Sequence, residues 1–343
     1  MERSKTHLFN LYSMKKVLLG FLTVLLVSFG SNAQFKRTFL NNYNDLSVFR
    51  MKILDSDVGN LKLLSLHKNG SSTNYKLKVS EIGTNGDLLA VTNFPFTVSS
   101  ATGNNVVTIS NGFETPTDYT ISLLIKSTSA QVLSFYKINK ATGQVVQNFE
   151  APETFQVGYV QTEKIGNELV TYLVKPGGGL YRTAISASNL GSYYTELVDA
   201  SVSSSAGNSS YVNVKRSTEV KLVGGKELSV MSYTGTMKVY VRSGLNNYSP
   251  VTLGSSNQSG IHLVSLANDS LLVCDALNWY KVNAAAQVLV SGTFTTGSNY
   301  TQHLITSYPN GFYRIGKTGA NFLFENFDKQ LNLLSSNTYR GIN

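Results

Sequence analysis

The stretch that decides the fold is residues 261–294, which read IHLVSLANDSLLVCDALNWYKVNAAAQVLVSGTF. It holds four short runs rich in Leu, Val, Ile and aromatic residues, and small or polar residues separate them. Short apolar runs cut by turn-forming residues predict β-strands joined by tight turns. We therefore predict a four-stranded meander, with strands at Ile261–Ala267, Leu271–Ala276, Trp279–Asn283 and Gln287–Phe294.

The same pattern continues directly after this unit. Four further runs predict a second meander, with strands at His303–Tyr308, Phe312–Lys317, Asn321–Asp328 and Leu331–Tyr339. Few segments between residue 34 and this point show the 3.6-residue period of an amphipathic helix. The sequence therefore indicates an all-β protein.

The third strand of each unit carries a repeat marker, an aromatic residue followed by a long polar or aliphatic one. The marker begins at Tyr75, Tyr136, Tyr181, Tyr240, Tyr280 and Phe324, at intervals of 61, 45, 59, 40 and 44 residues. A four-stranded unit at this period is typical of propeller blades. We predict a single β-propeller of six four-stranded blades over residues 34–343. Seven blades, a pair of sandwiches or a β-solenoid are the alternatives.

Residues 136–146, YKINKATGQVV, place a Thr-Gly turn between two strands. This segment resembles the repeats of generic bacterial β-propeller proteins, and the resemblance implies a fold rather than an activity. Quinoprotein propellers have similar turns, but they depend on a repeated tryptophan that docks the blades. This chain has only Trp279 and no vicinal cysteine pair. We therefore expect neither a quinone nor another cofactor.

The N-terminal segment predicts export. Residues 14–16 are Met-Lys-Lys, residues 17–29 are almost purely apolar, and Ser31-Asn32-Ala33 places small residues before Gln34. A short positive region, an apolar run and a small-residue cleavage site make a secretory signal peptide, here residues 1–33 with Met14 as a possible true start. The junction resembles export signals of Bacteroidota. We expect a periplasmic, cell-surface or extracellular protein without a transmembrane helix in the mature chain.

Charge gives no support to a nucleic-acid partner. The formal net charge of +9 comes from 29 Lys and Arg against 20 Asp and Glu. Removing Glu2, Arg3, Lys5, Lys15 and Lys16 with the signal peptide leaves 25 minus 19, or +6. A nucleic-acid footprint requires many Lys and Arg residues clustered on one surface, and the mild charge of +6 does not indicate one.

Composition and motifs exclude several chemistries. The single cysteine, Cys274, excludes a disulfide framework and a cysteine-built zinc site. The chain has no Gly-x-Ser-x-Gly elbow, His-Glu-x-x-His pair, phosphate loop or dinucleotide fingerprint.

A gap-free alignment of the six units gives one column on the innermost strand. It reads Lys52, Asn111, Val160, Glu219, His262 and His303. Two imidazoles and a carboxylate suit acid–base chemistry or a metal ion. The competing interpretation is that repeated units keep similar polar residues in the channel, where they form hydrogen bonds with water. No flanking motif supports a metal, so we predict no metal site. Glu219, His262 and His303 are the candidates for an acid–base site in a central channel.

A second column lies where the second strands end. Lys68, Lys126, Lys175 and Lys317 occupy equivalent places in four units, each near a turn. Four ammonium groups on one face would attract an anionic ligand. Lysine at strand ends also keeps sheet edges soluble, which is the competing interpretation.

Together these features predict an exported, non-enzymatic propeller that binds a glycan or an envelope protein through one loop-decorated face. It would be a monomer or a subunit of a larger assembly. The alternative is a carbohydrate-active hydrolase or lyase with its site in the central channel. Because no catalytic motif is present, the binding function is the stronger hypothesis.

Overall fold

The computed structural model describes residues 48–53, 61–68, 74–82, 88–98, 106–126, 131–155, 159–203, 217–233, 235–256, 261–294, 302–308, 310–318 and 321–340. The predicted signal peptide lies outside these ranges. So does Phe35–Leu40, the segment that the sequence offers as a candidate strand to close the ring.

The described residues form six antiparallel sheets, which we number 1 to 6 in chain order. Sheets 1 to 3 consist of β1 (Val48–Ile53), β2 (Leu61–Lys68), β3 (Asn74–Ile82) and β4 (Leu88–Thr97); β5 (Val106–Glu114), β6 (Asp118–Lys126), β7 (Gln131–Asn139) and β8 (Val145–Glu150); and β10 (Glu163–Ile165), β11 (Glu168–Val174), β12 (Leu180–Ser186) and β13 (Tyr194–Asp199).

Sheets 4 to 6 follow the same order. They consist of β14 (Ser217–Val223), β15 (Lys226–Tyr233), β16 (Thr236–Gly244) and β17 (Asn247–Ser255); β18 (His262–Ser265), β19 (Leu271–Cys274), β20 (Asn278–Val282) and β21 (Val288–Thr293); and β22 (Gln302–Tyr308), β23 (Gly311–Thr318), β24 (Asn321–Asp328) and β25 (Leu333–Arg340).

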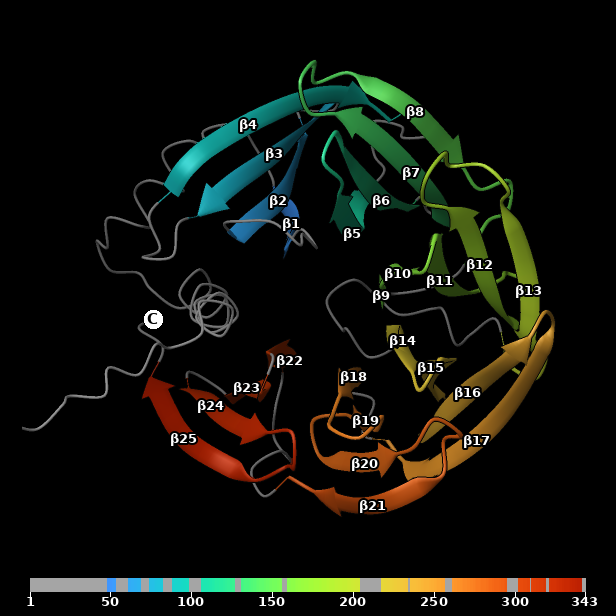
Figure 1. Cartoon of the computed structure of the whole chain (residues 1–343), viewed down its shortest axis with the longest axis vertical. Helices are drawn as coiled ribbons and strands as arrows, with labels where there is room; N and C mark the ends of the chain where they lie inside the picture. The colour runs from blue at the N-terminus through green and yellow to red at the C-terminus, as the bar shows by residue number, and fades with distance from the viewer. Residues whose placement is uncertain are drawn as a thin grey trace, which may run out of the picture.

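The six sheets stand around a ring in chain order, with the first strand of each toward the centre and the fourth outside (Figure 1). Innermost strands of successive sheets contact one another, as β1 does with β5 and β14 with β18. This architecture is a β-propeller, so the all-β propeller prediction is confirmed. The strands of sheets 5 and 6 lie within two residues of their predicted positions.

Sheet 4 departs from the four-stranded pattern. The two-residue strand β9 (Tyr159–Val160) precedes β10 in the chain but pairs in parallel with β14, the innermost strand of sheet 4. The alignment placed Val160 on the innermost strand of sheet 3, and this was wrong: that strand is β10, which begins at Glu163. The gap-free alignment fails here because β10 has only three residues, so the aligned position Val160 falls before its first residue.

Apolar clusters fill the spaces between neighbouring sheets. Because successive residues of a strand face opposite ways, one strand can supply two clusters. On β7, Tyr136 packs with sheet 1, whereas Phe135 packs in the cluster that includes sheet 3. An isolated meander leaves both faces of its sheet exposed, so the stacking of sheets supplies the core.

The outer hairpins carry the features that protect exposed sheet edges. The pairing between third and fourth strands contains a register shift in each of the six described sheets. Bulges of this kind twist an edge and disfavour pairing with another chain. Pro95 and Pro250 lie in the outermost strands β4 and β17, where a missing N–H does no harm.

The aromatic residues of Phe94-Pro95-Phe96 belong to a strand rather than to a loop. Phe94 lies in β4 and is buried between sheets 1 and 2. Its ring lies 3.4 Å from the place of a Cβ on Gly143, which has a φ of +70° in the Thr-Gly turn. Glycine is needed there for the left-handed conformation.

Candidate functional site

The four predicted lysines all lie where a second strand ends. Lys68 and Lys126 are the last residues of β2 and β6, Lys317 is next to last in β23, and Lys175 directly follows β11. Second strands run in one direction around the ring, so these ends belong to one face of the propeller. The backbone therefore brings the four positions to equivalent places in sheets 1, 2, 3 and 6.

Of these lysines, Lys175 has a described side chain. Its Nζ lies 3.7 Å from Oε1 of Glu153 and 4.2 Å from the ring centre of Tyr181. Both charged side chains keep about a quarter of their surface exposed, at 26% and 27%. Partly exposed ion pairs contribute little to stability, so this contact leaves the ammonium group able to exchange partners.

The inner column brings two of its three candidates together. His262 in β18 and Glu219 in β14 lie on neighbouring innermost strands, with 3.2 Å between His262 Nδ1 and Glu219 Oε1. The Leu263 N–H donates to Glu219 Oε2 at 2.7 Å. His303 lies on β22 opposite Gly316, and its side chain is outside the described residues.

The electrostatics of Glu219 suit a fixed carboxylate rather than a proton donor. Burial acts to raise its pKa, but the hydrogen bond and charge of His262 and the N–H of Leu263 outweigh burial. The net effect is a pKa below the ordinary value for glutamate. A carboxylate of this kind orients its histidine partner, whereas a general acid near neutral pH needs a raised pKa.

Other contacts between innermost strands have the same character. Ser110 of β5 and Thr162 share a hydrogen bond at 3.0 Å, and the Thr162 and Thr171 hydroxyls lie 2.9 Å apart. Lys221 of β14 contacts Glu163 of β10 at 2.5 Å. The polar inner strands therefore join neighbouring sheets, and Glu219 with His262 is one of these junctions.

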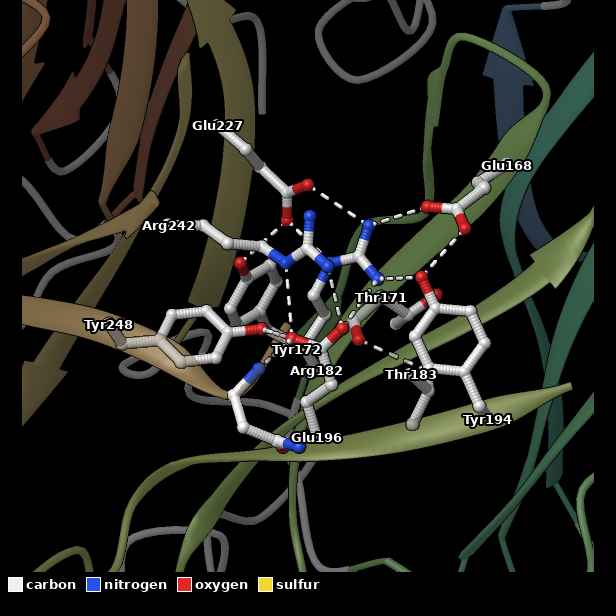
Figure 2. A network of polar contacts seen from close by, with 11 residues as sticks. Glu168, Thr171, Tyr172, Arg182, Thr183, Tyr194, Glu196, Glu227, Arg242 and Tyr248 are labelled. Carbon is white, nitrogen blue, oxygen red and sulfur yellow. Dashed lines mark hydrogen bonds and ion pairs between the residues drawn. The ribbon is translucent and has the colours of Figure 1, made fainter. Parts of the chain in front are cut away.

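An extensive polar cluster of the described residues lies between sheets 3 and 4 (Figure 2). Arg182 of β12 is fully buried, at 0% exposure. Its Nε donates to Glu227 of β15 at 2.8 Å, and its guanidinium also donates to Glu168 at 2.7 Å and to Tyr194 at 2.9 Å. The Tyr172 hydroxyl donates to Glu227 at 2.6 Å. One guanidinium thus links the two sheets.

A second guanidinium extends this cluster. Arg242 of β16 donates to Glu196 of β13 at 2.7 Å and 3.1 Å, and the Tyr248 hydroxyl donates to the same carboxylate. Burial acts to raise the pKa of Glu196, but the hydrogen bonds from Arg242 and Tyr248 lower it below the ordinary value. We call the set Glu168, Tyr172, Arg182, Tyr194, Glu196, Glu227, Arg242 and Tyr248 the Arg182 network.

The Arg182 network satisfies its own charges. Burial acts to lower the pKa of Arg182, but the hydrogen bonds and charge of Glu227 raise it, so the guanidinium stays protonated. Such a network holds two sheets in register and offers no open donor set for a substrate. The sequence held a signal for it, since Arg182 follows Tyr181 in a repeat marker and Arg242 lies two residues after Tyr240.

Across the part of the chain that the structure describes, no group of three or more His, Cys, Asp or Glu residues is placed to hold a metal ion. Within the same residues, no helix is long and apolar enough to cross a membrane.

Comparison with known proteins identifies the fold and no family. No protein-family model matches the chain, and no curated protein matches it. The solved structure of dihydro-heme d1 dehydrogenase NirN in complex with DHE is similar, with a TM-score of 0.50 and 10% identity over 84% of this chain and 57% of that one. A mutant puromycin hydrolase complexed with PGG has a TM-score of 0.51 and 10% identity over 87% and 46%.

This chain spans about half the length of those two proteins. At 10% identity the likeness shows the propeller fold alone. Both proteins are named for enzymatic activities, so the comparison does not separate a binding function from a catalytic one.

Proposed function

We propose that this chain is an exported propeller that binds an acidic glycan on the face where the second strands end. The observation that carries the proposal is the equivalence of Lys68, Lys126, Lys175 and Lys317 at the ends of four second strands. Positive charges repeated around a rigid ring suit a polymer with repeated negative charges. Binding groups on loops and strand ends of a rigid scaffold are where function commonly lies.

Electrostatic attraction of this type has a defined signature. It weakens as salt screens the charges, because the screening length falls from about 30 Å at 0.01 M to about 3 Å at 1 M ionic strength. Binding of a carboxylated or sulfated polysaccharide should therefore fall steeply with salt. Binding of a neutral polysaccharide should be absent or independent of salt.

The test compares two quadruple Lys→Gln variants of the purified protein by calorimetry or glycan array. One changes the four strand-end lysines. The control changes Lys164, Lys226, Lys281 and Lys329, which lie toward the opposite ends of the strands or in the opposite turns. Both variants lose four charges, so only a site at the strand ends makes their affinities differ.

We expect the strand-end variant to lose acidic-glycan binding and the control to keep it. Equal affinities in the two variants would show that net charge alone attracts the glycan. If the protein bound an acidic protein and none of the glycans, the ligand of this face would be a protein rather than a glycan.

The alternative function is a carbohydrate-active hydrolase or lyase, and the contact between His262 and Glu219 favours it. A carboxylate-oriented imidazole on an innermost strand is a plausible base. The measurement is polysaccharide cleavage by the wild-type protein and by His262→Gln. Loss of cleavage in a folded His262→Gln variant would support the enzyme hypothesis. If the wild-type protein cleaves no acidic or neutral glycan, the enzyme hypothesis is rejected.

Export is part of the proposal and has a direct test. We expect the secreted form of the protein to begin at Gln34. N-terminal sequencing of protein recovered from the cell envelope or medium gives the answer, and a chain that keeps residues 14–33 in the cytoplasm contradicts export.

A further inference from the structure

Two neighbouring sheets carry the same pairing of a lysine with a carboxylate from the sheet before. Lys175 Nζ lies 3.7 Å from Oε1 of Glu153, which follows the outer strand of sheet 2. Lys238 Nζ, on β16 of sheet 4, lies 3.6 Å from Oδ2 of Asp199, the last residue of the outer strand of sheet 3. Fourth strands end, and third strands begin, on the face where second strands end. Both pairs therefore lie on the face of the strand-end lysines.

A tyrosine hydroxyl holds each of these carboxylates in place. Tyr193 donates to Oε2 of Glu153 at 2.7 Å, and Tyr240 donates to Oδ2 of Asp199 at 2.8 Å. An isolated surface ion pair would need no explanation, because such pairs are common and weak. Here an ammonium group, a carboxylate and a phenol recur together at two successive boundaries between sheets, which indicates one arrangement used twice.

The two carboxylates differ in how many acceptor positions the protein itself uses. A carboxylate has about four lone-pair positions. Asp199 accepts from its tyrosine and also from the backbone N–H and the hydroxyl of Ser201, at 2.8 Å and 2.5 Å. Glu153 accepts from Tyr193 and has one longer contact, 3.4 Å, with the Thr195 hydroxyl. The side chain of Glu153 is 27% exposed against 12% for Asp199, so Glu153 is the more open acceptor.

An apolar surface lies beside the pair in sheet 3. The Lys175 ammonium group is 4.2 Å from the ring centre of Tyr181, and Leu197 lies opposite Tyr181 on the next strand with 44% of its surface exposed. A Cβ on Gly179 would lie 2.9 Å from the Tyr181 ring and 3.3 Å from Leu197, so glycine is needed for the turn to lie against both side chains. We call Lys175, Glu153, Tyr181 and Leu197 the Lys175 group.

We propose that the Lys175 group binds one sugar of a polyuronate, and that Lys238 and Asp199 bind another sugar of the same polymer. This inference rests on the proposed function and narrows its ligand. The ammonium groups pair with the carboxylates of the sugars, Glu153 accepts hydrogen bonds from sugar hydroxyls, and the apolar surface contacts the C–H groups of a sugar ring.

The carboxylates are what select among acidic polymers. A polyuronate carries one carboxylate and free hydroxyls on each sugar, so it supplies both an anion for the lysine and donors for Glu153. A densely sulfated polymer has few free hydroxyls and brings more negative charge close to Glu153 and Asp199. Like charges brought together in this way oppose binding. The face should therefore prefer a polyuronate to a densely sulfated polymer.

The test compares polygalacturonate with dextran sulfate by calorimetry at about 0.15 M salt. The wild-type protein should bind polygalacturonate more tightly. Glu153→Gln should weaken polygalacturonate binding about fivefold, because a neutral amide is a weaker acceptor than a carboxylate. The same variant should bind dextran sulfate more tightly, because a repelling charge is gone, and this gain also shows that the variant folds. Attraction by net charge alone would raise both affinities.

Two controls separate the site from its surroundings. Glu150→Gln removes the same charge three residues away, from an exposed side chain at the end of β8, and should leave the preference for polygalacturonate unchanged. Lys238→Gln should weaken polygalacturonate binding, whereas Lys226→Gln, at the start of β15 in the same sheet and on the opposite face, should not.

The outcomes distinguish this inference from the function on which it rests. Tighter binding of dextran sulfate by the wild-type protein overturns the polyuronate preference and leaves an acidic-glycan function in place. Binding of neither polymer overturns both. A polygalacturonate affinity that rises equally in Glu153→Gln and Glu150→Gln shows that Glu153 accepts nothing from the ligand. Equal affinities in Lys238→Gln and Lys226→Gln exclude the second sugar site.

Discussion

Two interfaces of the propeller do the same structural task with different chemistry. Between sheets 1 and 2 the main buried cluster is aliphatic and aromatic, with Leu77 and Ile121 fully buried at 0% exposure, and the ion pair of Lys62 with Glu114 joins the same two sheets beside it. Between sheets 3 and 4, the third strand carries Arg182 instead, also at 0% exposure, with Glu227 across the interface. The propeller geometry therefore requires that neighbouring sheets pack together. It does not determine whether apolar side chains or a network of charged side chains fill the space between them.

The difference predicts different failures. An apolar interface loses contacts in proportion to the atoms removed and leaves a cavity. A buried charge network depends on complete pairing, since removal of one member leaves its partners charged and desolvated. Mutations in the two interfaces should therefore differ in size and in their response to pH.

The largest effect is expected from Arg182→Met. The change keeps much of the side-chain volume but leaves Glu227 buried without its guanidinium partner. Breaking a buried ion pair in this way costs about 3–5 kcal/mol of unfolding free energy. Denaturant titration measures it. The control is Lys281→Met at the matching marker position of sheet 5, which is half-exposed and should change stability by less than about 0.5 kcal/mol. Similar losses in both variants would contradict a special role for Arg182.

Leu77→Ala probes the apolar interface. Truncation of a fully buried leucine should cost about 3 kcal/mol, from lost burial and a residual cavity. Because no charge is involved, the loss should be the same at pH 7 and pH 5 by denaturant titration. A loss that changes between these pH values would show that titrating groups also support this interface.

Tyr248→Phe tests one hydrogen bond at the edge of the Arg182 network. The hydroxyl donates to the Glu196 carboxylate, and a hydrogen bond to a charged group contributes about 1.5–3 kcal/mol. We expect a loss near the lower limit, because Arg242 still pairs with Glu196. The control is Tyr119→Phe between sheets 1 and 2, whose ring packs edge-on against Phe94. An equal loss in both variants would place the effect in packing rather than in the hydrogen bond.

The strands could be predicted from the sequence because their signals are local. Turn residues and short apolar runs define β24, for example, which has its predicted bounds Asn321–Asp328. The positions of the four lysines on second-strand ends follow from the same local pattern. Their role as a ligand site stays a prediction.

The faces of the markers could not be predicted. Tyr136 and Tyr240 face the preceding sheet, where Tyr240 donates to Asp199, whereas Tyr75 packs toward the following sheet. A shift of one residue reverses the face of a strand and leaves its sequence pattern almost unchanged. A gap-free alignment therefore does not show which face of the sheet a marker residue occupies.

The burial of Arg182 was equally hidden. Arginine is seldom buried without a partner, and its partner Glu227 lies 45 residues away in another sheet. Pairing at that distance depends on which faces meet, and a single sequence does not show which faces meet.

Acid distinguishes the two interfaces without any mutation. In the interface of sheets 3 and 4, Glu168, Glu196 and Asp199 have pKa values below their ordinary values. Burial acts to raise each of these pKa values, but hydrogen bonds outweigh it. The main hydrogen bond comes from Arg182 for Glu168, from Arg242 for Glu196 and from Ser201 for Asp199.

A carboxyl whose pKa is lower in the folded chain stabilises the fold above its unfolded value and loses that contribution as pH falls through the folded value. The contribution of these three groups is therefore complete near pH 7 and declines below about pH 4.5. The aliphatic contacts between sheets 1 and 2 do not titrate. Hydrogen exchange at pH 7 and at about pH 3.5, corrected for intrinsic rates, should show β12 and β16 losing more protection than β3 and β6. Equal losses in the two pairs would mean that the ring opens as one unit in acid, and that the charge network gives its interface no separate sensitivity.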